Sequence, residues 1–219
     1  MAVILCIETS TTNCSVAIAI DGEIKAIREE NNQKYSHAEK LHVFIDEVLK
    51  EANLDKKQLN AVAVSKGPGS YTGLRIGVSA AKGLCFALDI PLISTFTLEV
   101  LVQQVKSEDC YIIPLLDARR MEVYSAVFNS EKKQIRETKA EILDESSFLE
   151  YLNKRKTIFI GDGSNKFETL CKNENAVFYK DGIPSAADMA LIAEAKYKIN
   201  DTENIAYFEP FYLKEFMLG

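Results

Sequence analysis

The chain has 219 residues, of which 47% are hydrophobic and 26% charged, as in an ordinary globular protein of one large or two small domains. Its formal net charge of −6 argues against a stand-alone nucleic-acid-binding protein, because contacts with phosphate supply most of the affinity of such proteins. The five cysteines include no C-x-x-C pair, which argues against a zinc site or a disulfide framework. The first ten residues lack the basic region of a signal peptide, and we expect a cytoplasmic protein.

The first half of the chain predicts a three-stranded meander followed by alternating helices and strands. An Asp-Gly pair at 21–22 indicates a tight hairpin, and Ser36 with Glu39 indicates a capping box at the start of a helix. From the spacing of the apolar residues we expect strands at 2–8, 14–20, 23–30, 60–65 and 91–95, and helices at 36–54, 71–88 and 97–106.

The second half repeats this order of elements without repeating the residues. We expect strands at 111–117, 122–128, 134–142, 157–161 and 176–180, and helices at 147–154, 165–171 and 186–200. Two such units in tandem match the duplicated actin/Hsp70-like (ribonuclease H-like) α/β fold, with two similar mixed-sheet subdomains. We expect the subdomains to comprise residues 1–106 and 107–219.

The stretch SKGPGSYTGLRIG, residues 65–77, could be a phosphate-binding loop. Its glycines do not have Walker A spacing, and Thr72 stands where a Rossmann fingerprint needs its third glycine. An anion site at the helix start, helped by Arg75, stays open as an alternative. Gly73, Gly77 and Ala80 recur at intervals of three or four, so they form a stripe that lets another backbone approach closely. That backbone belongs either to a partner or to the chain's own sheet.

A second candidate site follows the first strand, in the stretch ETSTTN at 8–13. It resembles the first phosphate loop of the actin/Hsp70 class, in which an acid, here Glu8, helps to place a metal and hydroxyls, here Ser10 and Thr11, meet phosphates. Asp117, which ends the corresponding strand of the second half, would be its partner. The alternative is an ordinary polar turn, with Asp117 neutralised by the two arginines that follow. Glu8 stands where that class prefers Asp, and we assign no cofactor.

The sequence offers no catalytic or metal-binding motif. His37 and His42 are five residues apart, which places them about 140° apart around a helix and disfavours a shared metal. Neither the G-x-S-x-G motif of hydrolases nor the H-E-x-x-H motif of metalloproteases occurs. We therefore expect neither a metal site nor catalytic residues.

Four stretches together carry a family resemblance that covers the whole chain: ILCIETSTTNCSVAI, KGPGSYTGLRIGVSAAKGL, LLDARRMEVY and FEPFYLKE. They resemble the TsaB (YeaZ) family of bacterial tRNA threonylcarbamoyladenosine biosynthesis proteins. The resemblance implies a reduced second subdomain and no independent catalytic activity. It implies an activator and scaffold for the transferase TsaD, which works with the ATPase TsaE, and a homodimer when the chain is alone. It implies contact with tRNA only through the complex.

The resemblance also implies that helices of the first subdomain form the interface in both dimers. The residues this assigns are Leu41, Phe44, Ile45, Thr72, Gly73, Arg75, Ile76, Gly77 and Ala80. An alternative function is a small actin-fold ATP-dependent phosphotransferase, for which 160–167 is the only glycine-bearing candidate for an adenosine pocket. A peptidase that acts on TsaD is a third class, and the sequence holds no nucleophile motif for it.

Overall fold

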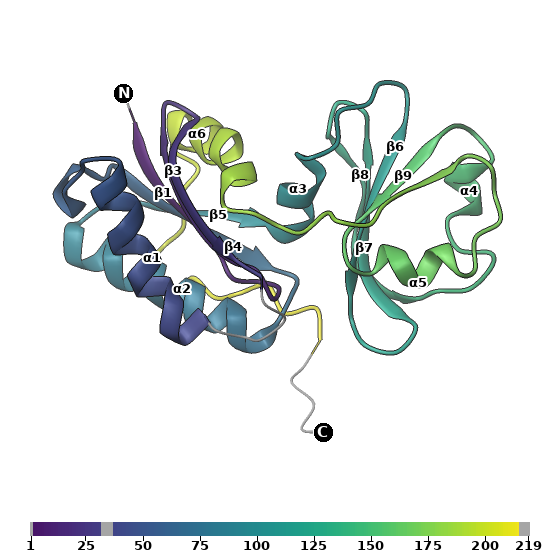
Figure 1. Cartoon of the computed structure of the whole chain (residues 1–219), viewed down its shortest axis with the longest axis horizontal. Coiled ribbons are helices and arrows are strands. Elements are labelled where there is room, and N and C mark those ends of the chain that lie inside the picture. Colours follow the sequence, from purple (N-terminus) through teal and green to yellow (C-terminus); the bar gives the residue numbers. More distant parts are fainter. Residues whose placement is uncertain (1, 32–36, 215–219) are drawn as a thin grey trace. The chain divides into compact units, whose positions relative to one another are not determined.

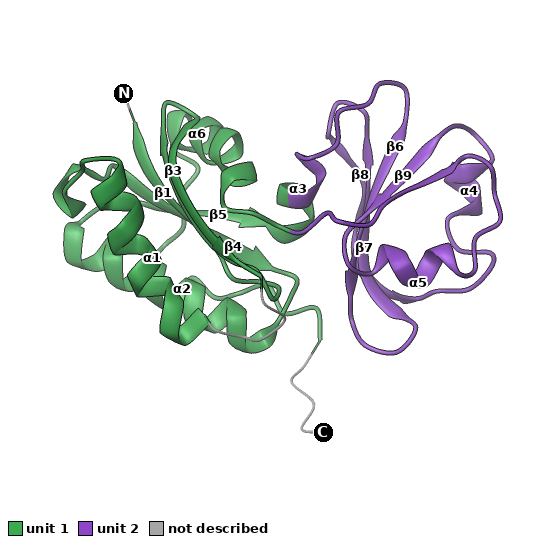
Figure 2. Cartoon of the chain, viewed as in Figure 1, with its two compact units in different colours: residues 1–100, 184–219 green, residues 101–183 purple. Residues whose placement is uncertain are grey.

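The computed structural model describes residues 2–31 and 37–214 (Figure 1). The chain divides into two compact units, of which unit 1 comprises Met1–Val100 with Pro184–Gly219, and unit 2 comprises Leu101–Ile183 (Figure 2). Each unit contains one five-stranded mixed sheet. Within the described ranges, no helix combines the length and the apolar character that crossing a bilayer requires.

Unit 1 is built on a sheet with the strand order β3-β2-β1-β4-β5. The strands are β1 Val3–Glu8, β2 Cys14–Ile20, β3 Glu23–Glu30, β4 Ala61–Gly67 and β5 Leu92–Phe96. The first three form an antiparallel meander, and β4 and β5 add in parallel. Alternate residues of β1 enter two different cores, because successive side chains of a strand point to opposite faces.

Helices cover both faces of this sheet, as Figure 1 shows. Helices α1 (His37–Glu51) and α2 (Tyr71–Leu88) pack on one face, and η2 (Ala187–Met189) and α6 (Ala190–Lys198) pack on the other. Helix α2 begins where the hydroxyl of Ser70 accepts a hydrogen bond from the amide of Gly73. The remaining short helices of unit 1 are η1 Lys56–Gln58 and α3 Thr97–Val102, whose last two residues belong to unit 2.

Unit 2 repeats the same connectivity, with the strand order β10-β9-β6-β7-β8. Its strands are β6 Tyr111–Asp117, β7 Glu122–Asn129, β8 Gln134–Ile142, β9 Thr157–Ile160 and β10 Ala176–Tyr179, and its helices are α4 Leu149–Leu152 and α5 Ser164–Glu168. A cluster of aromatic rings fills its core, where Phe159 and Phe167 lie 4.8 Å apart between ring centres. In both units the first strand lies between the second and the fourth, which confirms the expected duplication.

The main differences from the sequence-based expectations lie at the end of the chain. The expected subdomain 107–219 is divided, because residues from Pro184 onward belong to unit 1. The reason is the apolar face of α6, where Ala190 and Ala193 join the core formed by Ile4 and Cys6. The helix expected at 97–106 ends at Val102, and the one expected at 186–200 begins with a 3-10 turn. Ser36 of the expected capping box lies outside the described residues.

Candidate functional site

The glycine loop lies directly on the turn that follows β1. The amide of Ser70 donates a hydrogen bond of 2.6 Å to the carbonyl oxygen of Ser10. A Cβ atom at Gly69 would lie 2.3 Å from that same oxygen, so only glycine fits at this position. The glycine loop therefore covers the turn within residues 8–13, the candidate phosphate loop.

The first two turns of α2 approach the same turn at Thr9. A Cβ atom at Gly73 would lie 2.1 Å from the carbonyl oxygen of Thr9, and one at Gly77 would lie 2.2 Å from its Oγ1. The Thr9 hydroxyl donates a 2.7 Å hydrogen bond to the carbonyl oxygen of Gly73. Both glycines are buried. The close approach at these two positions is thus made by the chain itself, and it leaves no room there for a partner's backbone.

The other residues assigned to an interface divide by exposure. Leu41, Phe44 and Ile45 of α1 are buried in the core that α1 and α2 share with the sheet. Thr72 and Arg75 of α2 are exposed, whereas Ile76 and Ala80 are partly exposed. Of the residues assigned to an interface, only these four of α2 can touch a partner while unit 1 keeps its fold, and their role stays a prediction.

The outward-facing side of α2 is wider than the sequence suggested. We call it the outer face of α2, and it consists of Thr72, Arg75, Ile76, Ser79, Ala80, Gly83 and Phe86. No atom lies within 4 Å of the place where a Cβ of Gly83 would be, and Phe86 is 82% exposed. The sequence reasoning missed Ser79, Gly83 and Phe86. Their signal was the helical period, which places 72, 76, 79, 83 and 86 on one side and 73 and 77 on the other.

Two tyrosines hold Arg75 on this face. Its guanidinium carbon lies 4.1 Å from the centre of the Tyr71 ring, and its Nε donates a 3.2 Å hydrogen bond to the hydroxyl of Tyr212. The two tyrosine rings are themselves 4.9 Å apart. Ordering a long side chain on binding costs free energy, and part of this cost is already met for Arg75. Arginine and tyrosine are also the residue types that most often dominate binding energies.

Glu8, the acid of the candidate phosphate loop, is completely buried. Its Oε1 accepts a 2.7 Å hydrogen bond from the amide of Ser10. Burial raises the pKa of the Glu8 carboxyl above its ordinary value, and hydrogen bonding with Ser10 and Ser65 opposes this only in part. Burial thus disfavours the charged form of this carboxyl relative to that of an exposed glutamate. Thr11 contributes its carbonyl oxygen to a 2.8 Å contact with Nε2 of His37.

The raised pKa of Glu8 predicts a pH-dependent stability. Between the ordinary pKa and the raised one, the folded chain binds more protons at Glu8 than the unfolded chain does, so stability falls as pH rises. We expect Glu8→Gln to flatten this dependence and to raise the free energy of unfolding relative to the unaltered chain above that range. Urea denaturation followed between pH 4 and pH 8 measures it. If the free energy of unfolding depended on pH in the same way in both proteins, the raised pKa of Glu8 would be contradicted.

Asp117 lies in unit 2 and has its own partners there. Its Oδ1 lies 2.8 Å from the amine of Lys166 and accepts a 2.6 Å hydrogen bond from the amide of Arg119. Asp162, whose pKa is raised by burial, accepts a hydrogen bond from the Asp117 amide. Lys166 therefore neutralises Asp117, whereas the sequence had suggested the side chains of the arginines that follow it.

The two histidines of α1 differ in their environments. His37 is buried, and burial lowers the pKa of its ring, whereas His42 is exposed. Across residues 2–31 and 37–214, no group of three or more His, Cys, Asp or Glu side chains is placed to hold a metal ion.

Comparison with known proteins decides the family. A family model described as TsaD, tRNA N6-adenosine threonylcarbamoyltransferase, matches residues 29–214. The tRNA threonylcarbamoyladenosine biosynthesis protein TsaB of Escherichia coli is 31% identical over 223 residues, which cover 96% of this chain and 94% of that protein. The chain belongs to the TsaB family.

Solved structures show the fold of this TsaB-family chain. YeaZ from Pseudomonas aeruginosa is 24% identical, with a TM-score of 0.82 over 97% of this chain and 100% of that one. The activator of the 2-hydroxyisocaproyl-CoA dehydratase from Clostridium difficile, solved with bound ADPNP, is 12% identical, with a TM-score of 0.50 over 92% of this chain and 98% of that one. These likenesses confirm the expected duplicated actin-like fold.

In this TsaB-family chain the residues proposed for a phosphate site do not fit one. In unit 1, the loop at Gly69 and Ser70 occupies the space above Ser10, and Glu8 is enclosed. In unit 2, Asp117 is bound by Lys166. Glu8, Thr11 and Asp117 thus each have a hydrogen-bond or ion-pair partner within their own unit.

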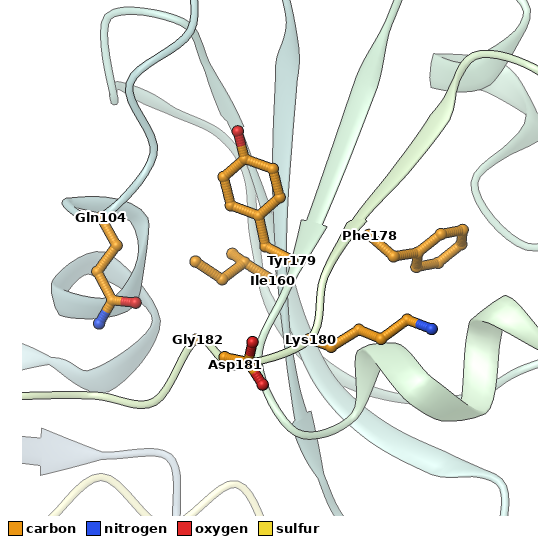
Figure 3. A pocket seen from close by; sticks show the side chains of 7 residues that line it. All are labelled: Gln104, Ile160, Phe178, Tyr179, Lys180, Asp181 and Gly182. Carbon is orange, nitrogen blue, oxygen red and sulfur yellow. The ribbon is translucent and has the colours of Figure 1, made fainter.

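Unit 2 also contains an open hollow of about 540 Å³ at the carboxyl ends of β9 and β10, where ligands often bind in α/β sheets (Figure 3). The side chains of Phe178 and Lys180 point away from Tyr179 rather than toward a common centre. Phe178 stacks on Phe159 in the core, with ring centres 5.2 Å apart. Of the candidate stretch 160–167, only Ile160 lines this hollow. The hollow therefore gives no support to an adenosine pocket.

Proposed function

We propose that this chain is a non-catalytic activator and scaffold subunit of the complex that forms threonylcarbamoyladenosine beside the anticodon of tRNA. In this proposal it binds the transferase TsaD and works with the ATPase TsaE in the cytoplasm. Its relative in Escherichia coli is named as a biosynthesis protein of this modified nucleoside, and the matching family model carries the name of the transferase. These names support a role in the biosynthesis of this nucleoside. The proposed binding to TsaD is supported by the surface of unit 1.

The observation that carries the proposal is the outer face of α2. It places the 82% exposed Phe86 one helical turn from Gly83, beside which there is open space. Aromatic residues, phenylalanine among them, are enriched in interfaces relative to the rest of the surface, and the open space beside Gly83 lets a partner approach the helix closely. The ordered Arg75 and its tyrosines lie toward the start of the same helix. We propose that the homodimer and the complex with TsaD use this same surface and therefore exclude each other.

The isolated chain is expected neither to hydrolyse ATP nor to modify tRNA. The buried Glu8 and the closed loop above Ser10 offer no place for a metal-bound phosphate in unit 1. A sensitive phosphate-release assay and mass spectrometry of tRNA nucleosides measure both activities. ATP turnover that disappears in Glu8→Ala or Asp117→Ala would instead support the alternative phosphotransferase.

Reconstitution tests the proposed function as a whole. TsaD, TsaE, tRNA and the threonylcarbamoyl donor are combined with or without this chain, and the modified nucleoside is quantified. We expect modification only when the chain is present, at a rate that saturates at one chain per TsaD. Equal modification without the chain, or no association between the chain and TsaD, would overturn the proposal.

A further inference from the structure

One end of the sheet in unit 2 brings together the ends of four strands. Tyr111 at the start of β6 is paired with Asn129 at the end of β7 and with Thr157 at the start of β9. Ala176 at the start of β10 is paired with the same Thr157. Residues that flank these strands therefore gather along one edge, spaced by the distance between strands of about 5 Å.

Basic residues outnumber acidic ones at this edge, where Glu108, Asp109, Glu131 and Glu174 also flank the strand ends. The carbonyl oxygen of Lys156 accepts a hydrogen bond from the Tyr111 amide, and that of Lys133 accepts one from the Asn129 amide, so both lysines adjoin the paired residues. Lys154 and Arg155 directly precede Lys156. We call Lys133, Lys154, Arg155 and Lys156 the basic edge, and all four are exposed.

The three lysines of the basic edge form no ion pair with a carboxylate of the described residues, a state that they share with Lys50, Lys57, Lys82, Lys106, Lys132 and Lys172. Nine other lysines form ion pairs with carboxylates, at positions 25, 40, 56, 66, 139, 166, 180, 196 and 198. Within the described ranges, Lys133, Lys154 and Lys156 have no such partner, although Glu131 lies in the same turn as Lys133. In a chain with a net charge of −6, a surplus of free cations at one edge favours an anion supplied from outside.

Arg155 differs from the lysines, because the chain itself holds its side chain. Its guanidinium pairs with Asp109 at 2.7 Å and lies 5.1 Å from the centre of the Tyr111 ring. That ring contacts Tyr151 edge-on, with 5.2 Å between the ring centres. The chain thus orients Arg155, which lies between Lys154 and Lys156 in the sequence. The ammonium groups of lysine are compact point charges on flexible stems, and lysine and arginine both contact the phosphates of nucleic acids.

We propose that the basic edge contacts the phosphate backbone of tRNA while the chain is part of the complex. This proposal rests on the proposed function, which brings the chain and tRNA into the same assembly. Three lysines neutralise few phosphates, so the edge adds to the affinity of the complex for tRNA without making the acidic chain an RNA-binding protein by itself.

The test uses the complete complex with TsaD and compares two triple variants. The first variant, Lys133→Glu/Lys154→Glu/Lys156→Glu, reverses the charge of the three lysines of the basic edge. Arg120→Glu/Lys139→Glu/Lys180→Glu makes the same change in net charge at other exposed positions of unit 2. The binding of tRNA is measured at several salt concentrations, and the assembly of each variant with TsaD is measured separately.

We expect the edge variant to lower the affinity for tRNA at least tenfold at physiological salt. The negative slope of log affinity against log salt should become shallower by about 2 to 3. The control variant should change neither quantity to this extent. Equal losses in both variants, or no loss in the edge variant, would overturn the proposal. So would an edge variant that loses a protein partner but keeps its affinity for tRNA. Failure of the unaltered chain to assemble with TsaD overturns the proposed function, and this proposal with it. Normal assembly with unchanged tRNA affinity overturns the basic edge alone.

Discussion

Replacing Gly73 by alanine is expected to destabilise the protein, although alanine is a better helix former than glycine. The added methyl group would lie 2.1 Å from the carbonyl oxygen of Thr9, which is a backbone atom and cannot rotate away. Overpacking of a buried contact costs about 1–3 kcal/mol. The gain in helix propensity is about 1 kcal/mol and offsets only part of this cost, because relieving the contact must move the backbone. We expect a net loss of about 1–2 kcal/mol, which corresponds to roughly 2–8 °C in Tm for a chain of this size.

Gly83→Ala is the matched control, because it makes the same chemical change in the same helix. No atom lies within 4 Å of its new methyl group, so only the helix propensity changes. We expect this variant to be more stable than the unaltered chain by up to about 1 kcal/mol. Thermal and urea denaturation followed by circular dichroism, at one low protein concentration, compares the three proteins. Equal stability of the two variants would show that Gly73 does not pack against Thr9.

Gly83→Arg is expected to abolish the homodimer and to weaken binding to TsaD by about 30-fold or more, as for the loss of a central interface contact worth about 2 kcal/mol. The arginine side chain extends from an exposed position, so unit 1 can keep its fold. It places a charged group next to Phe86, where the proposed partner helix would lie. Sedimentation analysis measures the dimer, titration calorimetry measures the affinity for TsaD, and modification of tRNA should fall in parallel.

Ala195→Arg provides the control for added bulk and charge. Ala195 is an exposed residue of α6, which covers the opposite face of the sheet in unit 1 (Figure 1). We expect this variant to dimerise and to bind TsaD normally. If Gly83→Arg is folded, as circular dichroism reports, and still dimerises and supports modification, then the outer face of α2 is not the interface. Gly77→Arg does not serve this purpose, because its side chain would enter the core at Thr9 and is expected to unfold the chain.

The periodicity of the sequence determined the elements and their order in this protein. Continuous apolar runs such as residues 3–7 marked strands buried on both faces, and the Asp-Gly turn at 21–22 marked the first hairpin. The repeated order of strands and helices then predicted a duplicated fold, which both sheets have. These signals are local. A local pattern suffices to predict the type and order of the elements, because each helix or strand buries its own apolar side.

The tertiary structure alone decided what the glycines of α2 and the acid of β1 do. Helix α2 carries Thr72, Arg75, Ser79 and Lys82 along one side, so its sequence indicates which side faces outward. It does not show which backbone approaches the glycines on the other side. The contact of Gly73 and Gly77 with Thr9 joins segments more than sixty residues apart, and only the register of β1 beside β4 brings them together. The same register buries Glu8 and leaves Gly83 and Phe86 exposed. Which segment packs against the glycines depends on the sheet beneath the helix, and no pattern within the helix encodes that contact.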